Sequence, residues 1–187
     1  MLEDLVLVVT ELAKVVIVLG VACIAVAVIV DIAVVLIGKK ASKDVYTAIR
    51  EDVGLGLSRK NITIEIATDK GLMGSLITHT MMRGNKRVPI YRVIYINPWT
   101  LLRRCTTMGL RYRDLGEMVV VVIEHELGHI IAHTDYDAGV STVPLVSMVN
   151  EIDAWDRGVG CSGVQYQQEV YEKVREFSLN SYTKAGY

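Results

Sequence analysis

The sequence predicts an α+β domain preceded by one transmembrane helix, and two patterns carry this prediction. Residues 15–38 form a run of 24 residues with a single charged side chain, Asp31. The remainder alternates short β-type segments with longer stretches of helical periodicity. A chain of 187 residues is long enough for one domain with a real core and one appendage. We therefore expect a hydrophobic helix over residues 1–40 and a folded domain over residues 41–187.

Composition excludes several classes of protein. Hydrophobic residues make up 51% of the chain, which argues against disorder and is high for a wholly soluble protein. Lys and Arg number 20 and Asp and Glu 21, so the net charge of -1 creates no overall field for nucleic acid, and we expect no nucleic-acid partner. Three scattered cysteines, Cys23, Cys105 and Cys161, are too few for a disulfide scaffold and favour a reduced, intracellular setting.

The apolar run exceeds the roughly 20 residues that a helix needs to cross a bilayer. Its many Val and Ile residues would also suit strands, but a lipid-exposed strand cannot satisfy its own backbone groups. A secretory signal peptide fits poorly, because Glu3, Asp4 and Glu11 precede the run where positive charge is expected. We therefore expect residues 15–38 to contact the lipid bilayer; the alternative is a buried helix of a soluble protein. Asp31 either reaches the membrane interface or seeks a partner within the membrane.

Charges on either side of the run predict its orientation. Lys14 is the one lysine or arginine that precedes it. Four follow closely: Lys39, Lys40, Lys43 and Arg50. Positive charge is retained on the cytoplasmic side, so a single-pass protein with residues 39–187 in the cytoplasm is expected.

The folded domain is expected to begin with a helix and three strands. Ser42 is a candidate N-cap for a helix that ends at Gly54. Alternation of apolar residues predicts a strand over Asn61–Ala67. Two more strands, Leu72–Met82 and Val88–Ile96, are joined by a hairpin turn and followed by the strand-stopping pair Asn97-Pro98.

Three helices are expected after the strands. The first is long and mostly apolar, from Asp114 to about His133. Pro144 opens the second, which extends through Arg157, and the last spans Gln165–Phe177. A local basic cluster precedes them and is interpreted as a solvated face or a lipid headgroup contact: Arg103, Arg104, Arg111 and Arg113.

One short segment carries the residues of a metal site. His125 and His129 are four residues apart, so both imidazoles lie on one face of a helix and can bind a single Zn²⁺ ion. Glu126 is adjacent to the first histidine, where its carboxylate can reach a water molecule on the metal rather than the metal itself. The chemistry predicted is hydrolysis of a peptide bond by zinc-activated water, with Glu126 as general base.

A third protein ligand is needed, and three residues are candidates. His133 lies about 12 Å from His125 along the same helix, too far to share the ion. Asp135 would complete a metzincin-like pattern, although Ala132 stands where that pattern needs a glycine for a sharp turn. Glu151 lies on the next expected helix, from which a carboxylate can project to the metal.

Together these motifs resemble those of the gluzincin metallopeptidases. HExxH followed by ExxAxxxG is the signature of that family, and Glu151, Ala154 and Gly158 match the second motif. The order of elements is similar to that of the membrane-anchored heat-shock and CAAX-processing proteases, and the short gap between motifs to that of the minigluzincins. The resemblance implies a zincin-like domain, in which a small mixed sheet packs its edge strand on the active-site helix, with Glu151 as the third zinc ligand.

The resemblance also implies roles beyond the ligands. An edge strand near Gly74–Met81 would hold a peptide or protein substrate as an added antiparallel strand. Trp155 stands where relatives carry an aspartate that orients a zinc-bound histidine, a role for which Asp153 or Asp156 would substitute. Gly74 itself stands where relatives often carry Asn. An oxyanion-stabilising residue is also implied, with three candidates: His133, Tyr136 and Tyr166.

These features predict a membrane-anchored zinc metalloendopeptidase. The alternative function is a non-catalytic, membrane-anchored binding or assembly protein that keeps the same fold and holds zinc for structure. Glu126 favours the enzyme, because a structural zinc site needs no general base. The sequence leaves the oligomeric state and the substrate open.

Overall fold

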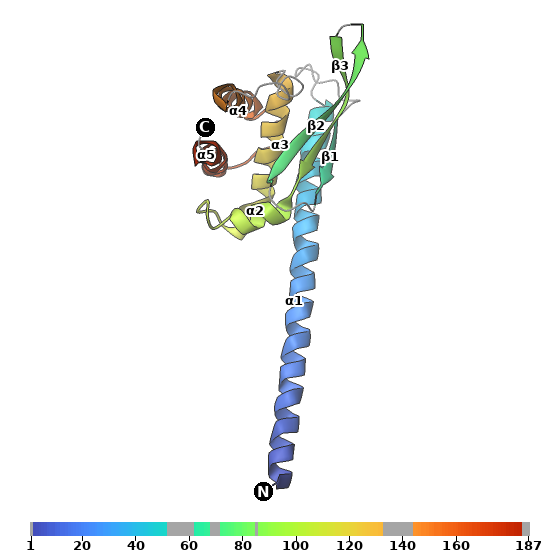
Figure 1. Ribbon diagram of the computed structural model, residues 1–187, viewed down its shortest axis with the longest axis vertical. Coiled ribbons are helices and arrows are strands. Elements are labelled where there is room, and N and C mark those ends of the chain that lie inside the picture. Colours follow the sequence, from blue (N-terminus) through green and yellow to red (C-terminus); the bar gives the residue numbers. More distant parts are fainter. Residues whose placement is uncertain (1, 52–61, 68–71, 85, 133–143, 185–187) are drawn as a thin grey trace. The chain divides into compact units, whose positions relative to one another are not determined.

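A computed structural model describes residues 2–51, 62–67, 72–84, 86–132 and 144–184 (Figure 1). Contacts within the chain divide it into two compact units, Met1–Leu36 and Ile37–Tyr187. This division falls in the same helix as the boundary expected after residue 40.

The N-terminal helix, α1, spans Leu2–Glu51 without a break. A separate helix capped by Ser42 was therefore a wrong expectation. Ser42 is buried within the helix and its hydroxyl has no hydrogen-bond partner among the described residues, so it does not act as a cap. Neither Gly nor Pro follows Gly38 before the helix ends, so no residue of this segment interrupts the hydrogen-bond ladder.

The first unit of the chain is a helix with exposed side chains. Every position from 10 to 33 is exposed, including large apolar residues such as Leu19 and Ile24. By length and composition, α1 can cross a membrane. A helix in the core of a soluble protein would have most of these side chains buried. Among the described residues, positions 10–33 are exposed instead.

Three strands form a small mixed sheet, as expected from the sequence. They are β1 (Ile62–Ile66), β2 (Gly74–Arg83) and β3 (Lys86–Ile96), in the order β1-β3-β2. β1 pairs with β3 in parallel and β2 pairs with β3 antiparallel, so β2 is an edge strand. The register between β2 and β3 shifts between His79 and Thr80, opposite Pro89, which has no N–H to donate to the ladder.

Helix α2, Pro98–Arg104, was missed by the sequence analysis. The Asn97 side chain accepts a hydrogen bond from the Thr100 backbone N–H at 2.9 Å, and Pro98 occupies the first turn. The pair Asn97-Pro98, which was interpreted as stopping a strand, thus also starts a helix. Asn97 is the N-cap, and Pro98 is tolerated in the first turn because no backbone N–H is needed there.

The remaining helices follow the expected pattern with shifted ends. They are α3 (Leu115–Ile131), preceded by a 3₁₀ turn at Tyr112–Asp114, then α4 (Pro144–Gly158) and α5 (Gln168–Lys184). Helix α5 continues beyond the expected end at Phe177. This extension brings a tyrosine, Tyr182, to the functional site described below.

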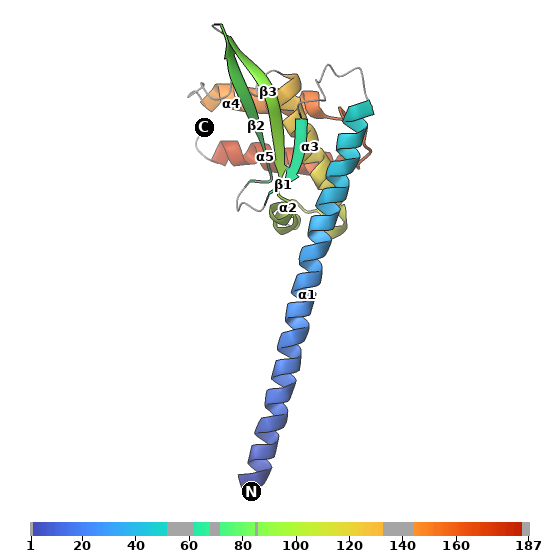
Figure 2. The ribbon, with the colours of Figure 1, turned by 90° about the vertical axis from the view of Figure 1, so that its right-hand side faces the viewer.

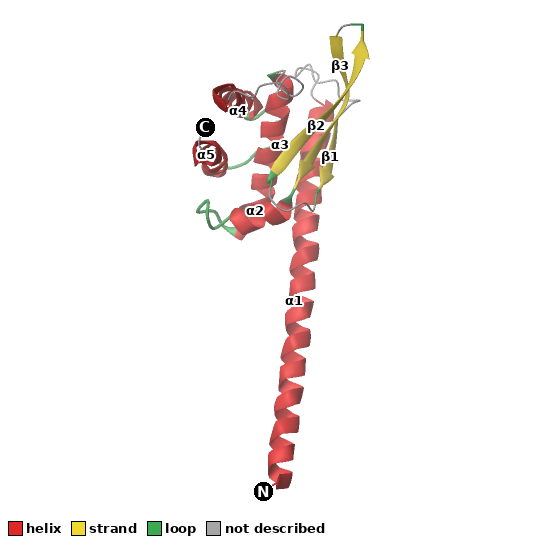
Figure 3. Cartoon of the chain, in the orientation of Figure 1, coloured by secondary structure: helices red, strands yellow, loops and turns green. Residues whose placement is uncertain are grey.

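Helix α3 is the central layer of the second unit. It contacts the sheet on one side and both α4 and α5 on the other, as Figures 2 and 3 also show. Its Val119–Ile123 segment is buried at every position, so these β-branched residues fill the core from all sides of the helix. Because this part of α3 is enclosed, the polar residues that follow it, Glu124, His125 and Glu126, are buried.

Candidate metal centre

Two histidines of α3 form one wall of the site. His125 and His129 lie one helical turn apart, and their ring centroids are 4.7 Å apart with the rings nearly perpendicular. His125 is only 8% exposed. Burying an imidazole without a partner is costly, so the two rings need an acceptor or a metal ion on this face.

Glu151 of α4 faces both histidines. Its Oε2 lies 3.2 Å from Nε2 of His125, and its Oε1 lies 3.4 Å from Nε2 of His129. One ligand atom from each residue lies within 4.8 Å of the others, a group that can hold a metal ion. The structure therefore brings together the three side chains that the two motifs pointed to.

The spacing of these atoms suits a tetrahedral metal ion. Two ligand atoms that each lie 2.0–2.1 Å from a tetrahedral zinc are about 3.3–3.4 Å apart. The two oxygens of Glu151 lie 3.2 and 3.4 Å from the imidazole nitrogens, close to this separation, and one ligand atom from each residue lies within 4.8 Å of the others. Two imidazole nitrogens and one carboxylate oxygen would leave the fourth position open.

Two glycines allow α4 to reach α3 closely enough for this arrangement. A Cβ on Gly128 would overlap the carbonyl oxygen of Ala154, and one on Gly158 would overlap that of Glu124. The helices therefore cross backbone to backbone at these points. Ala154 and Gly158 are the small residues of the second motif, and their place at the crossing explains why Glu151, one turn earlier, faces the histidines.

Glu126 approaches the site from the side of the sheet. It is 7% exposed, and a Cβ on Gly74 of β2 would lie 3.2 Å from its Oε1 and overlap Val122. Gly74 thus lets the edge strand lie directly against α3. Burial and the neighbouring Glu151 raise the pKa of Glu126, whereas His125 and His129 lower it, and burial dominates.

Hydrogen bonding keeps Glu151 ionised. Burial acts to raise the pKa of Glu151, but hydrogen bonds from His125 and His129 outweigh it and hold this pKa well below its usual range. Glu151 is thus a carboxylate at neutral pH, the form in which it can bind a metal ion.

Trp155 packs against His125. Its ring stacks on the imidazole with centroids 4.1 Å apart and an interplanar angle of 23°. Asp153 and Asp156, which the resemblance suggested as substitutes, form ion pairs with Arg157 and Arg175. Within the described part of the chain, Nδ1 of His125 is buried with no hydrogen-bond partner.

Glu124 is a second buried carboxylate that the sequence analysis overlooked. It accepts hydrogen bonds from the backbone N–H of Gly160 (2.9 Å) and Ser162 (3.1 Å), the hydroxyl of Ser162 (2.5 Å) and the hydroxyl of Tyr166 (2.6 Å). These bonds attach the loop after α4 to the central helix. The available signal was a glutamate in an otherwise apolar stretch of a buried helix, which requires partners.

Of the three residues expected to stabilise an oxyanion, the structure describes Tyr166 alone. Tyr166 is engaged with Glu124 and does not line the cavity at the metal ligands. His133 and Tyr136 lie outside the described residues, and so does Asp135, the alternative third ligand.

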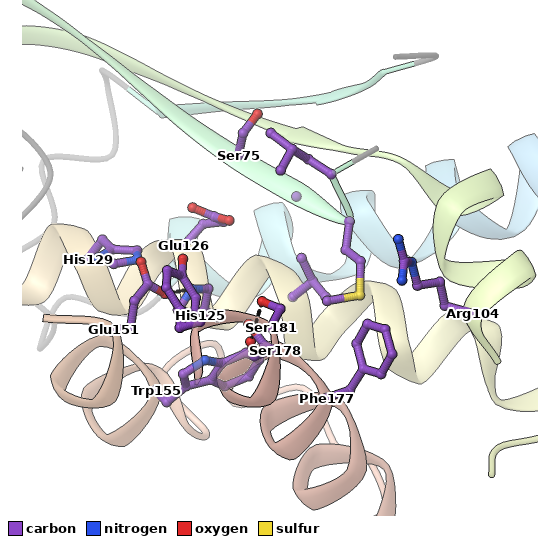
Figure 4. A pocket seen from close by; sticks show the side chains of 15 residues that line it. Ser75, Arg104, His125, Glu126, His129, Glu151, Trp155, Phe177, Ser178 and Ser181 are labelled. Carbon is purple, nitrogen blue, oxygen red and sulfur yellow. Dashed lines mark hydrogen bonds and ion pairs between the residues drawn. The ribbon is translucent and has the colours of Figure 1, made fainter. Parts of the chain in front are cut away.

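The cavity in front of the ligands has a volume of about 350 Å³ and includes Tyr182 of α5. Burial, the negative charge of Glu151 and a hydrogen bond to Glu151 all raise the pKa of Tyr182, so its hydroxyl stays protonated. Figure 4 shows His129 and Glu151 at one end of this cavity and Arg104 with Phe177 at the other. The sequence analysis missed Tyr182, and it placed Arg104 in the basic cluster without predicting its position at the cavity.

The basic cluster identified from the sequence is divided among several contacts. Arg111 and Arg113 lie beside Asp114, and Arg103 donates to the backbone carbonyl of Trp99. Arg104 lines the cavity. All four side chains are exposed, in agreement with the solvated face expected from the sequence, and Arg104 borders the cavity in addition.

Comparison of this chain with protein-family models, curated proteins and solved structures finds no match.

Proposed function

We propose that this chain is a membrane-anchored zinc metallopeptidase of the gluzincin type. His125, His129 and Glu151 would hold one zinc ion, and Glu126 would be the general base. The single observation that supports this most strongly is the convergence of two imidazoles and a carboxylate on a cavity that a second, buried carboxylate also lines. A structural zinc site closes its coordination with four protein ligands, so three ligands beside a free carboxylate favour hydrolysis.

Glu126 performs the proton transfers of the proposed reaction. A zinc ion, when bound, supplies Lewis acidity that lowers the pKa of water to about 7 and polarises a carbonyl group. Glu126 accepts the proton of the attacking water on a carboxylate oxygen and delivers it to the amine nitrogen that leaves. Its raised pKa, which results from burial, makes it a stronger base than an exposed glutamate.

Tyr182 is the proposed hydrogen-bond donor to the substrate carbonyl oxygen as negative charge develops on it. It lines the same cavity as the ligands, and its hydroxyl reaches Glu151. A donor for an oxyanion must retain its proton, and the raised pKa of Tyr182 ensures this at neutral pH.

The peptide substrate would bind along β2. This strand pairs only with β3 among the described strands, and its Gly74 end lines the cavity. An extended peptide added to its free edge would satisfy the backbone groups of β2 and carry a scissile bond past Glu126.

Residues 15–38 are the proposed membrane anchor, with residues 39–187 in the cytoplasm. The length and composition of α1 support an anchor. The excess of lysines after the apolar run supports the orientation.

The decisive experiment compares full-length protein and its Glu126→Gln variant after zinc loading. We expect both to bind zinc equally and to unfold at similar temperatures, with peptide cleavage by the variant lower by roughly 1,000-fold or more. Glu65→Gln, on the exposed face of β1, is the matched control and should cleave normally. Unchanged cleavage by Glu126→Gln would exclude the proposed mechanism, and zinc binding with no cleavage in any form would favour the non-catalytic assembly protein.

A further inference from the structure

The end of the cavity opposite the metal ligands carries a positive charge. Arg104, the last residue of α2, lines the cavity there, and its guanidinium carbon lies 5.2 Å from the centroid of the Phe177 ring (Figure 4). A guanidinium beside an aromatic ring retains N–H groups with which it can bind a carboxylate through two parallel hydrogen bonds.

This charge is not neutralised within the described part of the chain. No carboxylate there forms an ion pair with Arg104, whereas the neighbouring Arg111 and Arg113 both lie beside Asp114. Among the described residues that line the cavity, Arg104 is the single lysine or arginine. The two acidic residues of the cavity, Glu126 and Glu151, belong to the opposite end with the histidines.

The walls between the two ends combine apolar side chains with the hydroxyl groups of Ser178 and Ser181. Leu72 and Met73, which precede β2, and Val122 of α3 line the cavity together with Phe177. A substrate group that fits here would have an apolar stem along these walls and a negative charge at its end. A peptide offers such a group in two forms, an acidic side chain near the scissile bond or the carboxylate of its own C-terminus.

We propose that Arg104 binds a carboxylate of the peptide substrate and thereby determines the specificity of this site. The inference rests on the proposed peptidase function and adds the class of substrate: acidic peptides are preferred over their neutral counterparts. A cation at the end of the cavity opposite the proposed metal ligands would position the substrate rather than take part in bond cleavage.

The test uses full-length, zinc-loaded protein in detergent micelles and pairs of otherwise identical peptides. One set places Glu or Gln at each position flanking the cleaved bond, and another has a free or an amidated C-terminus. For the wild type we expect kcat/KM to be roughly tenfold higher for the acidic member of one set, and the set that shows this identifies the source of the carboxylate.

Substitution then assigns the preference to Arg104. In Arg104→Gln the ratio of kcat/KM between the acidic and the neutral member should fall to about one, and in Arg104→Glu it should invert, with Lys-containing peptides favoured. The ratio is the readout, so any general loss of activity cancels. Arg103→Gln is the matched control, because Arg103 donates to Trp99 outside the cavity, and it should keep the wild-type ratio.

The outcomes separate this inference from the proposed function. Cleavage with no difference between acidic and neutral peptides, or an unchanged ratio in Arg104→Gln, overturns the role of Arg104 and leaves the peptidase intact. Zinc-loaded wild type that cleaves no peptide in either set overturns both.

Discussion

Gly128 lies directly against the backbone carbonyl of Ala154, so that any side chain at position 128 would occupy the space of that oxygen. The contact joins the helix that carries the two histidines to the helix that carries Glu151. Since the carbonyl belongs to a helix backbone, it cannot move aside as a flexible side chain can. The separation of the two helices, and with it the geometry of the candidate metal centre, depends on this glycine.

We predict that Gly128→Ala destabilises the protein by about 3 kcal/mol and lowers its zinc affinity, because α4 must move away from α3. Gly116→Ala is the matched control on the same helix, where a new Cβ would lie 3.7 Å from Ile37, an ordinary contact. That variant should be neutral or more stable by up to about 1 kcal/mol. Thermal unfolding and zinc titration measure both effects; equal stability of the two variants would contradict the packing argument.

The ligand set is tested by metal analysis of two variants. We expect Glu151→Ala to lose the zinc ion, because its carboxylate faces both imidazoles, and Asp135→Ala to retain it. Zinc content after dialysis, determined by mass spectrometry, distinguishes them. Loss of zinc in Asp135→Ala together with its retention in Glu151→Ala would establish the metzincin-like site instead.

Tyr182→Phe is expected to lower kcat by roughly 100-fold while zinc content stays unchanged, since a donor to the developing oxyanion acts in the transition state. Tyr112→Phe, which alters an exposed tyrosine outside the cavity, should have no effect. Steady-state kinetics and zinc analysis are measured together. If Tyr182→Phe instead releases zinc, the role of Tyr182 is to position Glu151 rather than to stabilise the substrate.

The contact between Tyr166 and Glu124 predicts a pH dependence of stability. Burial and the hydrogen bond to Glu124 raise the pKa of Tyr166 in the folded state above the value of about 10 expected in the unfolded chain. A group with a raised pKa stabilises the fold below its unfolded pKa, and this contribution is lost as pH rises beyond it.

Tyr166→Phe should therefore be less stable than wild type by about 1.5 kcal/mol at pH 7, and the difference should shrink above about pH 10. Denaturant unfolding of both proteins at pH 7, 9 and 10.5 gives the comparison. A difference that grows with pH would mean that the hydroxyl is not bonded as the structure has it.

The membrane orientation is open to a direct test. Protease added outside intact cells should leave residues 42–187 undigested, because the lysines after the apolar run favour a cytoplasmic location for this part. Permeabilised cells serve as the control in which digestion should occur. Digestion in intact cells would reverse the assignment.

Apolar patterns bounded by turn residues were sufficient to predict the strands, whereas α3 was predicted from its long apolar stretch together with the HExxH motif, and α4 from Pro144 at its start. The local sequence pattern failed at the end of the apolar run, where Ser42 was interpreted as a helix start although it is equally compatible with a helix interior. It failed again at α2, which is too short for a periodic pattern and is marked mainly by its cap, Asn97.

The sequence was enough to pair His125 with His129, because residues four apart lie on one face of a helix. It was also enough to nominate Glu151, because Glu151 matches the first position of the ExxAxxxG motif. Folding decided which groups meet across larger separations. Stacking of Trp155 on His125, the bonds that Glu124 makes to the loop after α4, and the entry of Arg104 and Tyr182 into one cavity all depend on how helices cross. Crossing geometry is set by packing of the whole core around α3, which no local pattern encodes.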